Sequence, residues 1–95
     1  MKNYSLSSFQ EHLKEELKNP KFRKAWEESE AEYVLATKLI EKRLKNKMSQ
    51  RTLAKKVKTT QAVISRIETM NANPSLNLLK RIASVLNTKL VLNFK

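Results

Sequence analysis

The 95-residue chain contains no glycine, and this limits how its helices can end. A helix commonly ends on a left-handed residue, and glycine is the residue that adopts this conformation without steric cost. Asparagine is the next best choice. Four asparagines lie where the helical patterns end: Asn46, Asn71, Asn73 and Asn87. We therefore expect helices whose ends are formed by asparagine or, at some cost, by larger residues.

Two apolar stripes lie in the first third of the chain, on either side of Pro20. Their members are four residues apart, which is the spacing of one helix face. The stripes consist of Phe9, Leu13 and Leu17 before the proline, and of Phe22 and Trp26 after it. The proline ends the first helix and suits a first helical position of the next. From Ser29 we expect a long helix that ends near Asn46.

Three short helices are expected in the second half, within SQRTLAKKV, TTQAVISRIET and SLNLLKRIASVLN. Each begins with a hydroxyl residue that can cap it: Ser49, Thr59 or Thr60, and Ser75. Each carries too few apolar residues to be stable alone, so the helices must pack on one another and on the long helix. The predicted fold class is all-α.

The tail TKLVLNF alternates in the manner of a β-strand. Leu90, Leu92 and Phe94 fall on one side and Val91 on the other. No other segment has a strand pattern, so a strand here needs a second copy of the chain. We therefore expect a homodimer in which two tails pair across a two-fold axis. The alternative is a frayed tail.

Charge is distributed unevenly along the chain. There are 20 Lys and Arg against 9 acidic residues, all Glu, for a formal net charge of +11. Residues 1–48 hold 11 basic and 8 acidic residues (net +3), whereas residues 49–95 hold 9 and 1 (net +8). The second half is therefore expected to bind a polyanion, although a lysine-rich surface can also serve solubility alone.

Several classes of function are disfavoured by composition. The chain has no Cys, no Asp and one His, which leaves little for thiolate chemistry, a metal site or an acid–base pair. We expect neither an enzyme nor a cofactor. No apolar run approaches the ~20 residues of a membrane span, and the charged N-terminus lacks a signal-like apolar core. A cytoplasmic protein is expected, and the Glu-rich N-terminal helices argue against a membrane-surface helix.

Residues 49–68, SQRTLAKKVKTTQAVISRIE, combine two short helices with a tight connection at residues 58–59. Apolar or small side chains fall on both sides of it: Leu53, Ala54, Val57, Ile64 and Ile67. This spacing is typical of a helix-turn-helix, in which a residue such as Ala54 must be small where the helices cross. The segment resembles the Xre/Cro-type helix-turn-helix of phage repressors, from Leu39 to Leu86, and the resemblance implies a five-helix bundle.

The resemblance implies two further features. Arg43, seven residues before Gln50, and Glu68, at the end of the second helix, are expected to form a largely buried ion pair. The family usually has glycine at the turn, so Lys58 is expected to take the left-handed conformation at a cost of about 1 kcal/mol.

A step of 100° per residue turns one face of the second helix outward when Ile64 and Ile67 face the core. By resemblance, the residues expected to read DNA bases in the major groove are Gln61, Ala62, Ser65 and Arg66. The residues expected at phosphates are Gln50, Lys55, Lys56, Lys58, Thr59 and Thr60. The alternative is a plain solvated surface.

The segment NPKFRKAWEESEAEYVLATKLIEKR, followed directly by this module, resembles HigA-type antitoxins of type II toxin-antitoxin modules. The resemblance implies that the N-terminal region wraps a small basic RelE-like (HigB-type) ribonuclease toxin while the dimer represses its own operon. The expected toxin contacts are Phe9, Leu13, Leu17, Phe22, Trp26, Glu27 and Glu30. The aromatic residues can instead fold back on the bundle.

Three regions are therefore expected: a toxin-binding helical extension over residues 1–30, a helix-turn-helix domain over residues 31–88, and a dimerisation strand over residues 89–95. The competing hypotheses are a free-standing Xre-type regulator and an interaction or RNA-binding protein in which the helix-turn-helix is only a scaffold.

Overall fold

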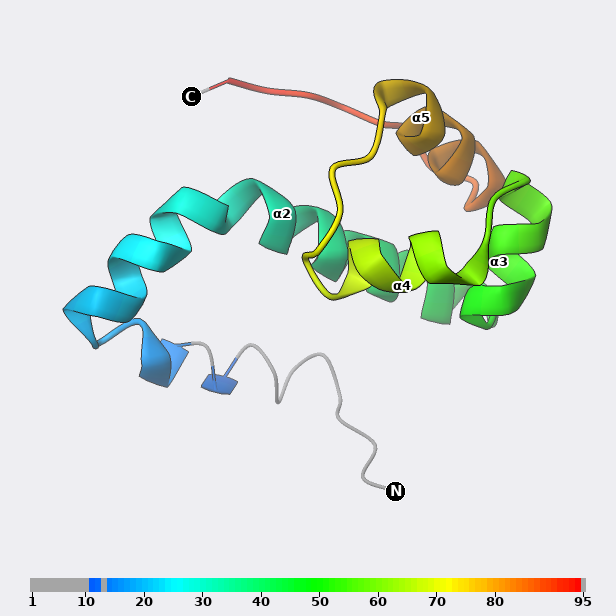
Figure 1. Ribbon diagram of the computed structural model, residues 1–95. Coiled ribbons are helices and arrows are strands. Elements are labelled where there is room, and N and C mark those ends of the chain that lie inside the picture. The colour runs from blue at the N-terminus through cyan, green and yellow to red at the C-terminus, as the bar shows by residue number, and fades with distance from the viewer. Residues whose placement is uncertain (1–10, 13, 95) are drawn as a thin grey trace.

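The computed structural model describes residues 11–12 and 14–94, and the regular structure of this part is entirely helical. The helices are α2 (Pro20–Lys45), α3 (Gln50–Val57), α4 (Gln61–Glu68) and α5 (Leu76–Val85), shown in Figure 1. Residues 11–12 and 14–16 are helical as well. The expected all-α class is confirmed for these residues, whereas Phe9 and Leu13 lie outside the described part.

Helix α2 is a single helix of 26 residues, about 39 Å long at 1.5 Å per residue. It begins as expected, with Pro20 in the first turn and the Asn19 side chain accepting a hydrogen bond from the Lys21 amide at 3.0 Å. A separate helix start at Ser29 is wrong. The Ser29 hydroxyl donates to the Ala25 carbonyl at 3.0 Å, so it bonds within the helix and caps nothing. The expected boundary after residue 30 therefore falls inside one helix.

Hydroxyl residues begin the other three helices. The side chains of Ser49, Thr60 and Ser75 accept hydrogen bonds from the amides three residues later, at 3.0–3.2 Å. Of the two threonines considered for α4, the cap is Thr60. These bonds satisfy amides that have no partner inside the helix and fix where each helix begins.

Helices α2, α3, α4 and α5 end in the same way. The residues with positive φ are Lys47, Lys58, Met70 and Asn87, with φ between 56° and 66°. At each of them the amide bonds to the carbonyl three residues back, and the next amide bonds to the carbonyl five before its own. This is the Schellman pattern. It confirms Lys58 and Asn87 as turn residues.

The other asparagines expected at helix ends, Asn46, Asn71 and Asn73, do not take the left-handed conformation. Asn46 has φ −87° and ends α2 through its side chain, which donates to the carbonyls of Lys42 at 2.7 Å and Leu86 at 3.4 Å. The left-handed residue is the next one, Lys47. A residue just after each of these helices therefore takes the left-handed conformation even where it is a lysine or a methionine, at a cost in backbone energy.

The core lies where three helix pairs meet: α3 packs against α4 and α5, and α2 packs against α4. Its least exposed side chains are Leu53, Val57 and Ile64. The other buried members of this cluster are Leu39, Ala54, Ile67, Leu78, Ile82 and Leu86. From α2 only Ala36, Thr37 and Leu39 are buried, so the bundle covers only its C-terminal half. Figure 1 shows the N-terminal half extending away from α3, α4 and α5.

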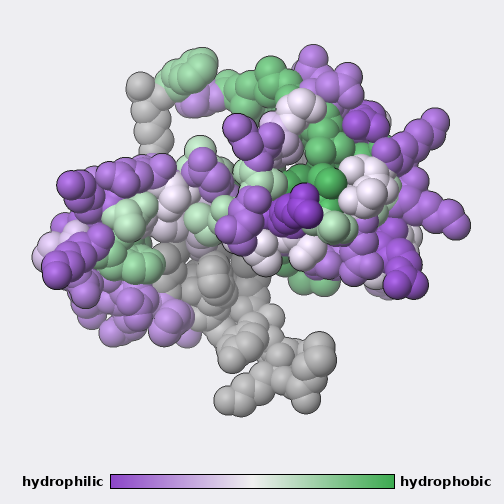
Figure 2. Space-filling view, in the orientation of Figure 1, coloured by the Kyte–Doolittle hydropathy of each residue, from purple (hydrophilic) through white to green (hydrophobic). Residues whose placement is uncertain are grey.

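The tail after α5 forms no strand within the described residues. Residues 88–94 have no regular structure and run away from α5 in Figure 1, because nothing within the described chain offers a strand edge for pairing. Leu90 is half-buried, but Val91, Leu92 and Phe94 are 76%, 62% and 98% exposed. Green, hydrophobic atoms lie along the upper edge of Figure 2, where Figure 1 shows the tail. The strand expected over residues 89–95 is therefore not formed in the single chain.

Candidate nucleic-acid interface

Helices α3 and α4 form a helix-turn-helix held by a tight connection. Lys58 takes the left-handed conformation, with φ 66° and ψ 48°, and the Thr59 amide donates to the Ala54 carbonyl at 2.9 Å. Ala54 is 3% exposed in the core beneath the two helices, as its small size predicts. The turn therefore fixes the direction in which α4 leaves α3.

The inner face of α4 is buried and its outer face is exposed. Ile64 and Ile67 have 0% and 2% exposure. Of the predicted base-reading residues, Gln61, Ala62 and Arg66 are exposed and Ser65 is half-buried. No acceptor among the described residues engages the Arg66 guanidinium. The outer face thus offers a free guanidinium, an amide and a methyl group, which are the groups that distinguish base pairs in the major groove.

The predicted phosphate-contact residues lie next to this face, but they differ in exposure and in whether their polar atoms are already hydrogen-bonded. Lys55, Lys56 and Lys58 are exposed at the end of α3. Thr59 is half-buried, and the Thr60 hydroxyl oxygen already caps α4. Of this group, the three lysines have exposed side chains that are free to contact an anion. The two threonines lie at the start of α4, where the backbone amides of a helix can bind an anion.

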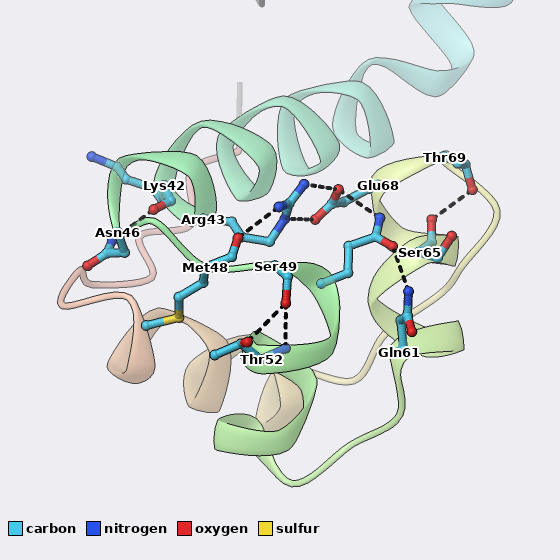
Figure 3. Close-up of polar contacts among 11 residues, drawn as sticks. Lys42, Arg43, Asn46, Met48, Ser49, Thr52, Gln61, Ser65, Glu68 and Thr69 are labelled. Carbon is cyan, nitrogen blue, oxygen red and sulfur yellow. Dashed lines mark hydrogen bonds and ion pairs between the residues drawn. The ribbon is translucent and has the colours of Figure 1, made fainter. Parts of the chain in front are cut away.

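An ion pair joins α2 to the end of α4. Arg43 donates through Nε to Glu68 Oε2 at 2.7 Å and through Nη2 to Glu68 Oε1 at 2.9 Å, with the side chains 13% and 5% exposed. Its third donor, Nη1, reaches the Met48 carbonyl at 2.9 Å. This bidentate pair, drawn in Figure 3, fastens α2 to α4 and the α2–α3 connection.

The ion pair is extended by two amides that lead to the exposed face. Gln50 Nε2 donates to Glu68 Oε1 at 3.1 Å, and Gln61 Nε2 donates to Gln50 Oε1 at 3.5 Å. Gln50 and Gln61 are the first residues of α3 and α4. Gln50, expected only as a phosphate contact, is thus half-buried and bonded to the ion pair. Its spacing from Glu68 gives no local signal for this contact.

Arg81 has a structural role that sequence patterns did not indicate. Its Nη1 donates to the Val57 carbonyl at 3.0 Å, 24 residues away in the chain. Val57 is the last residue of α3, whose carbonyl has no partner inside the helix. A cation at this end also suits the helix dipole. Arg81 therefore stabilises the end of α3, immediately before the turn that leads to α4.

The predicted toxin contacts lie on or before the N-terminal half of α2. Leu17, Phe22 and Trp26 are half-buried, Glu27 is exposed and Glu30 is half-buried. The Trp26 ring meets Tyr33 edge-on, with centroids 4.2 Å apart and planes at 72°. The tryptophan therefore packs partly against a residue of its own helix, outside the core cluster.

The fold and this exposed face define a helix-turn-helix protein, a class that binds DNA. A family model described as helix-turn-helix matches residues 39–93, which is more than half of the chain. The chain belongs to this family, the Xre/Cro type of DNA-binding transcription regulators. The match begins in the buried half of α2 and continues past Leu86 into the tail.

The comparisons with curated proteins and with solved structures gave no significant match. Over residues 11–12 and 14–94, no helix has both the length and the apolar character that crossing a membrane requires.

Proposed function

We propose that this regulator is an antitoxin that represses its own operon, with the two activities divided between α4 and the N-terminal half of α2. The observation that carries the DNA-binding half of the proposal is the exposed face of α4, on which Gln61, Ala62 and Arg66 are directed away from the buried Ile64 and Ile67. The toxin-binding half rests on the part of α2 that the bundle leaves uncovered.

In this proposal α4 enters the major groove of operator DNA. Arg66 donates twice to guanine O6 and N7, Gln61 pairs with adenine N6 and N7, and the Ala62 methyl group contacts a thymine methyl group. Ser65, half-buried beside Arg66, lies at the edge of this surface. Lys55, Lys56 and Lys58, together with amides of the first turn of α4, bind phosphates and set the position of the helix.

The regulator acts as a homodimer in this proposal. Two tails pair through Leu90, Val91, Leu92 and Phe94, which removes exposed apolar surface and unpaired backbone from both chains. The two-fold axis then places two α4 helices about one turn of DNA apart, so the operator is a palindrome with half-sites separated by about 10 base pairs.

The partner proposed for the N-terminal half of α2 is a small basic RelE-like toxin. Glu27, Glu28, Glu30 and Glu32 concentrate negative charge within six residues of an otherwise basic chain, which favours a cationic surface. Phe22 and Trp26 on the same helix provide aromatic anchors of the kind that dominate interfaces. The neutralisation would be steric, since the antitoxin covers the toxin without chemistry of its own.

A second candidate is a free-standing Xre-type regulator. It is favoured by the Trp26–Tyr33 contact, because an aromatic residue already packed on its own helix has less need of a partner. Co-expression of the chain with its neighbouring reading frame, followed by purification and mass determination, separates the two. A stable complex with a small basic protein that stops growth when expressed alone supports the antitoxin. A dimer that shifts its own promoter and retains no such protein would leave the free-standing regulator.

A further inference from the structure

Three of the four left-handed residues in the described chain share one feature: a side chain donates a hydrogen bond to the carbonyl just before them. The donors, their carbonyls and the left-handed residues are Asn71, Thr69 and Met70 (3.1 Å), Asn46, Leu86 and Asn87 (3.4 Å), and Arg81, Val57 and Lys58 (3.0 Å). Glycine would take this conformation without steric cost, and the chain has none. Each donor therefore restrains a peptide beside a residue that does not prefer its own conformation.

At Lys58 the donor comes from α5, and the turn that it restrains joins α3 to α4. Arg81 holds the oxygen of the Val57–Lys58 peptide, while the N–H of the same peptide donates to α3 at 3.2 Å. The plane of this peptide sets the φ of Lys58, which is 66°. The next peptide is bonded to α3 through the Thr59 amide at 2.9 Å. Both torsions of Lys58 are thus restrained, and its side chain leaves the turn in a fixed direction.

The charge around this turn favours a phosphate. Lys58 is exposed and takes part in no ion pair of the described chain, and residues 49–67 contain no acidic residue. A glycine here would carry no cation at all. We propose that Arg81 is a positioning residue for DNA binding, which fixes the Val57–Lys58 peptide so that the Lys58 side chain meets a DNA phosphate. The inference rests on the proposed binding of DNA by α4 and adds which residue holds one of its phosphate contacts.

The test measures the affinity of the full chain for its own promoter over a range of salt concentrations. The slope of log affinity against log salt concentration becomes smaller by about 0.9 for each phosphate contact that is lost. Lys58→Gly removes the cation, so its slope should be smaller by about 0.9. Arg81→Leu should give a similar decrease, because Lys58 is present but no longer held. The combined variant should show no greater decrease than Lys58→Gly alone, since both changes remove the same contact.

Two controls separate positioning from charge and from stability. Lys80→Leu removes one charge from the exposed residue that precedes Arg81 on α5, and it should leave the slope unchanged. Partial unfolding lowers the apparent affinity by one factor at every salt concentration, so it does not change the slope. If Arg81→Leu alone does not fold, the combined variant replaces it, because glycine at the turn needs no restraint. Its slope should then equal that of Lys58→Gly.

The outcomes distinguish this inference from the function on which it rests. A slope that stays unchanged in Arg81→Leu would overturn the positioning role and leave DNA binding by α4 intact. A decrease of about 1.8 in the combined variant would also overturn it, because Arg81 would then contact a phosphate itself. A wild-type protein that does not bind the promoter duplex would overturn the proposed function, and this inference with it.

Discussion

Helices α2, α3, α4 and α5 each end at a residue that lacks the conformational freedom of glycine. Lys47, Lys58 and Met70 hold left-handed backbone with φ of 56–66°, and Asn87 does so with the tolerance that asparagine has for this region. Such a residue costs about 1–2 kcal/mol relative to its preferred conformation. A substitution that relieves this backbone cost should therefore raise the free energy of unfolding without adding any new contact.

Lys58→Gly should stabilise the fold by about 0.5–1 kcal/mol, after allowance for the entropy that glycine adds to the unfolded chain. Such a change raises the melting temperature by roughly 4–8 °C per kcal/mol in a domain of this size. Lys56→Gly is the matched control, since Lys56 is exposed inside α3 and glycine there should destabilise by about 1 kcal/mol. Equal effects of the two substitutions in thermal melts would show that the left-handed conformation at Lys58 carries no strain.

The Arg43–Glu68 pair acts at the same scale, because its side chains are only 13% and 5% exposed. Glu68→Ala leaves the guanidinium without its partner and should cost about 3–5 kcal/mol of unfolding free energy. Replacing both residues, as Arg43→Met with Glu68→Leu, should cost less than either single change, since no buried charge remains unpaired. Urea denaturation of Glu68→Ala, Arg43→Met, Glu68→Leu and the double variant measures these losses. A loss below about 1 kcal/mol for Glu68→Ala would place the pair among exposed ion pairs.

At the scale of elements, α2 joins two surfaces in one rigid rod. Its C-terminal half supplies Leu39 to the core and Arg43 to the ion pair, while its N-terminal half carries Phe22 and Trp26 outside the core cluster. Because the helix is unbroken, substitutions in the N-terminal half should leave the α3–α4 surface undisturbed.

Phe22→Ala with Trp26→Ala should therefore weaken toxin binding without changing DNA binding. Aromatic anchors at interfaces are worth about 2 kcal/mol or more each, so the loss of one should lower affinity for the co-purifying toxin at least about 30-fold, and the loss of both should lower it further. Titration calorimetry gives the toxin affinity, and a promoter shift assay gives the DNA affinity. Lys24→Ala, exposed on the same helix, is the control and should change neither by more than a few fold. A double variant that retains full toxin affinity would move the contact elsewhere.

The helices also show which features can be predicted from the sequence. Short-range chemistry was predictable: the hydroxyl caps at Ser49 and Ser75, and the apolar spacing that buries Ile64 and Ile67. The left-handed Lys58 was predicted through the family resemblance, because the family usually has glycine at this turn. The start expected at Ser29 was wrong because its hydroxyl bonds back to Ala25 within a continuous helix.

Contacts between distant residues were harder to predict. No sequence pattern indicated that Arg81 reaches the Val57 carbonyl or that Gln50 donates to Glu68. These contacts depend on how α3, α4 and α5 are placed in space, which helical periodicity does not determine. Arg43 and Glu68 were paired only through the family resemblance, since they lie 25 residues apart.

At the scale of the whole molecule, the exposed tail is the feature that a second chain would change most. Deletion of residues 90–95 should reduce dimerisation and, with it, affinity for a palindromic duplex. Leu92→Lys with Phe94→Lys should do the same, because two charges replace apolar surface, whereas Asn93→Lys on the other side should have little effect. Sedimentation equilibrium measures the dimer. An undisturbed dimer after the deletion would place the dimer interface on another surface.

The central claim, that α4 reads DNA sequence, is tested most directly by measuring Arg66→Ala against Lys24→Ala on the chain's own promoter and on a scrambled duplex. Both variants lose one positive charge, but only Arg66 lies on the exposed face of α4. Arg66→Ala should lower promoter affinity by about 5- to 150-fold and reduce the ratio of promoter to scrambled binding. Lys24→Ala should leave this ratio unchanged. If Arg66→Ala and Lys24→Ala give the same ratio, α4 does not read bases through Arg66 and the account is contradicted.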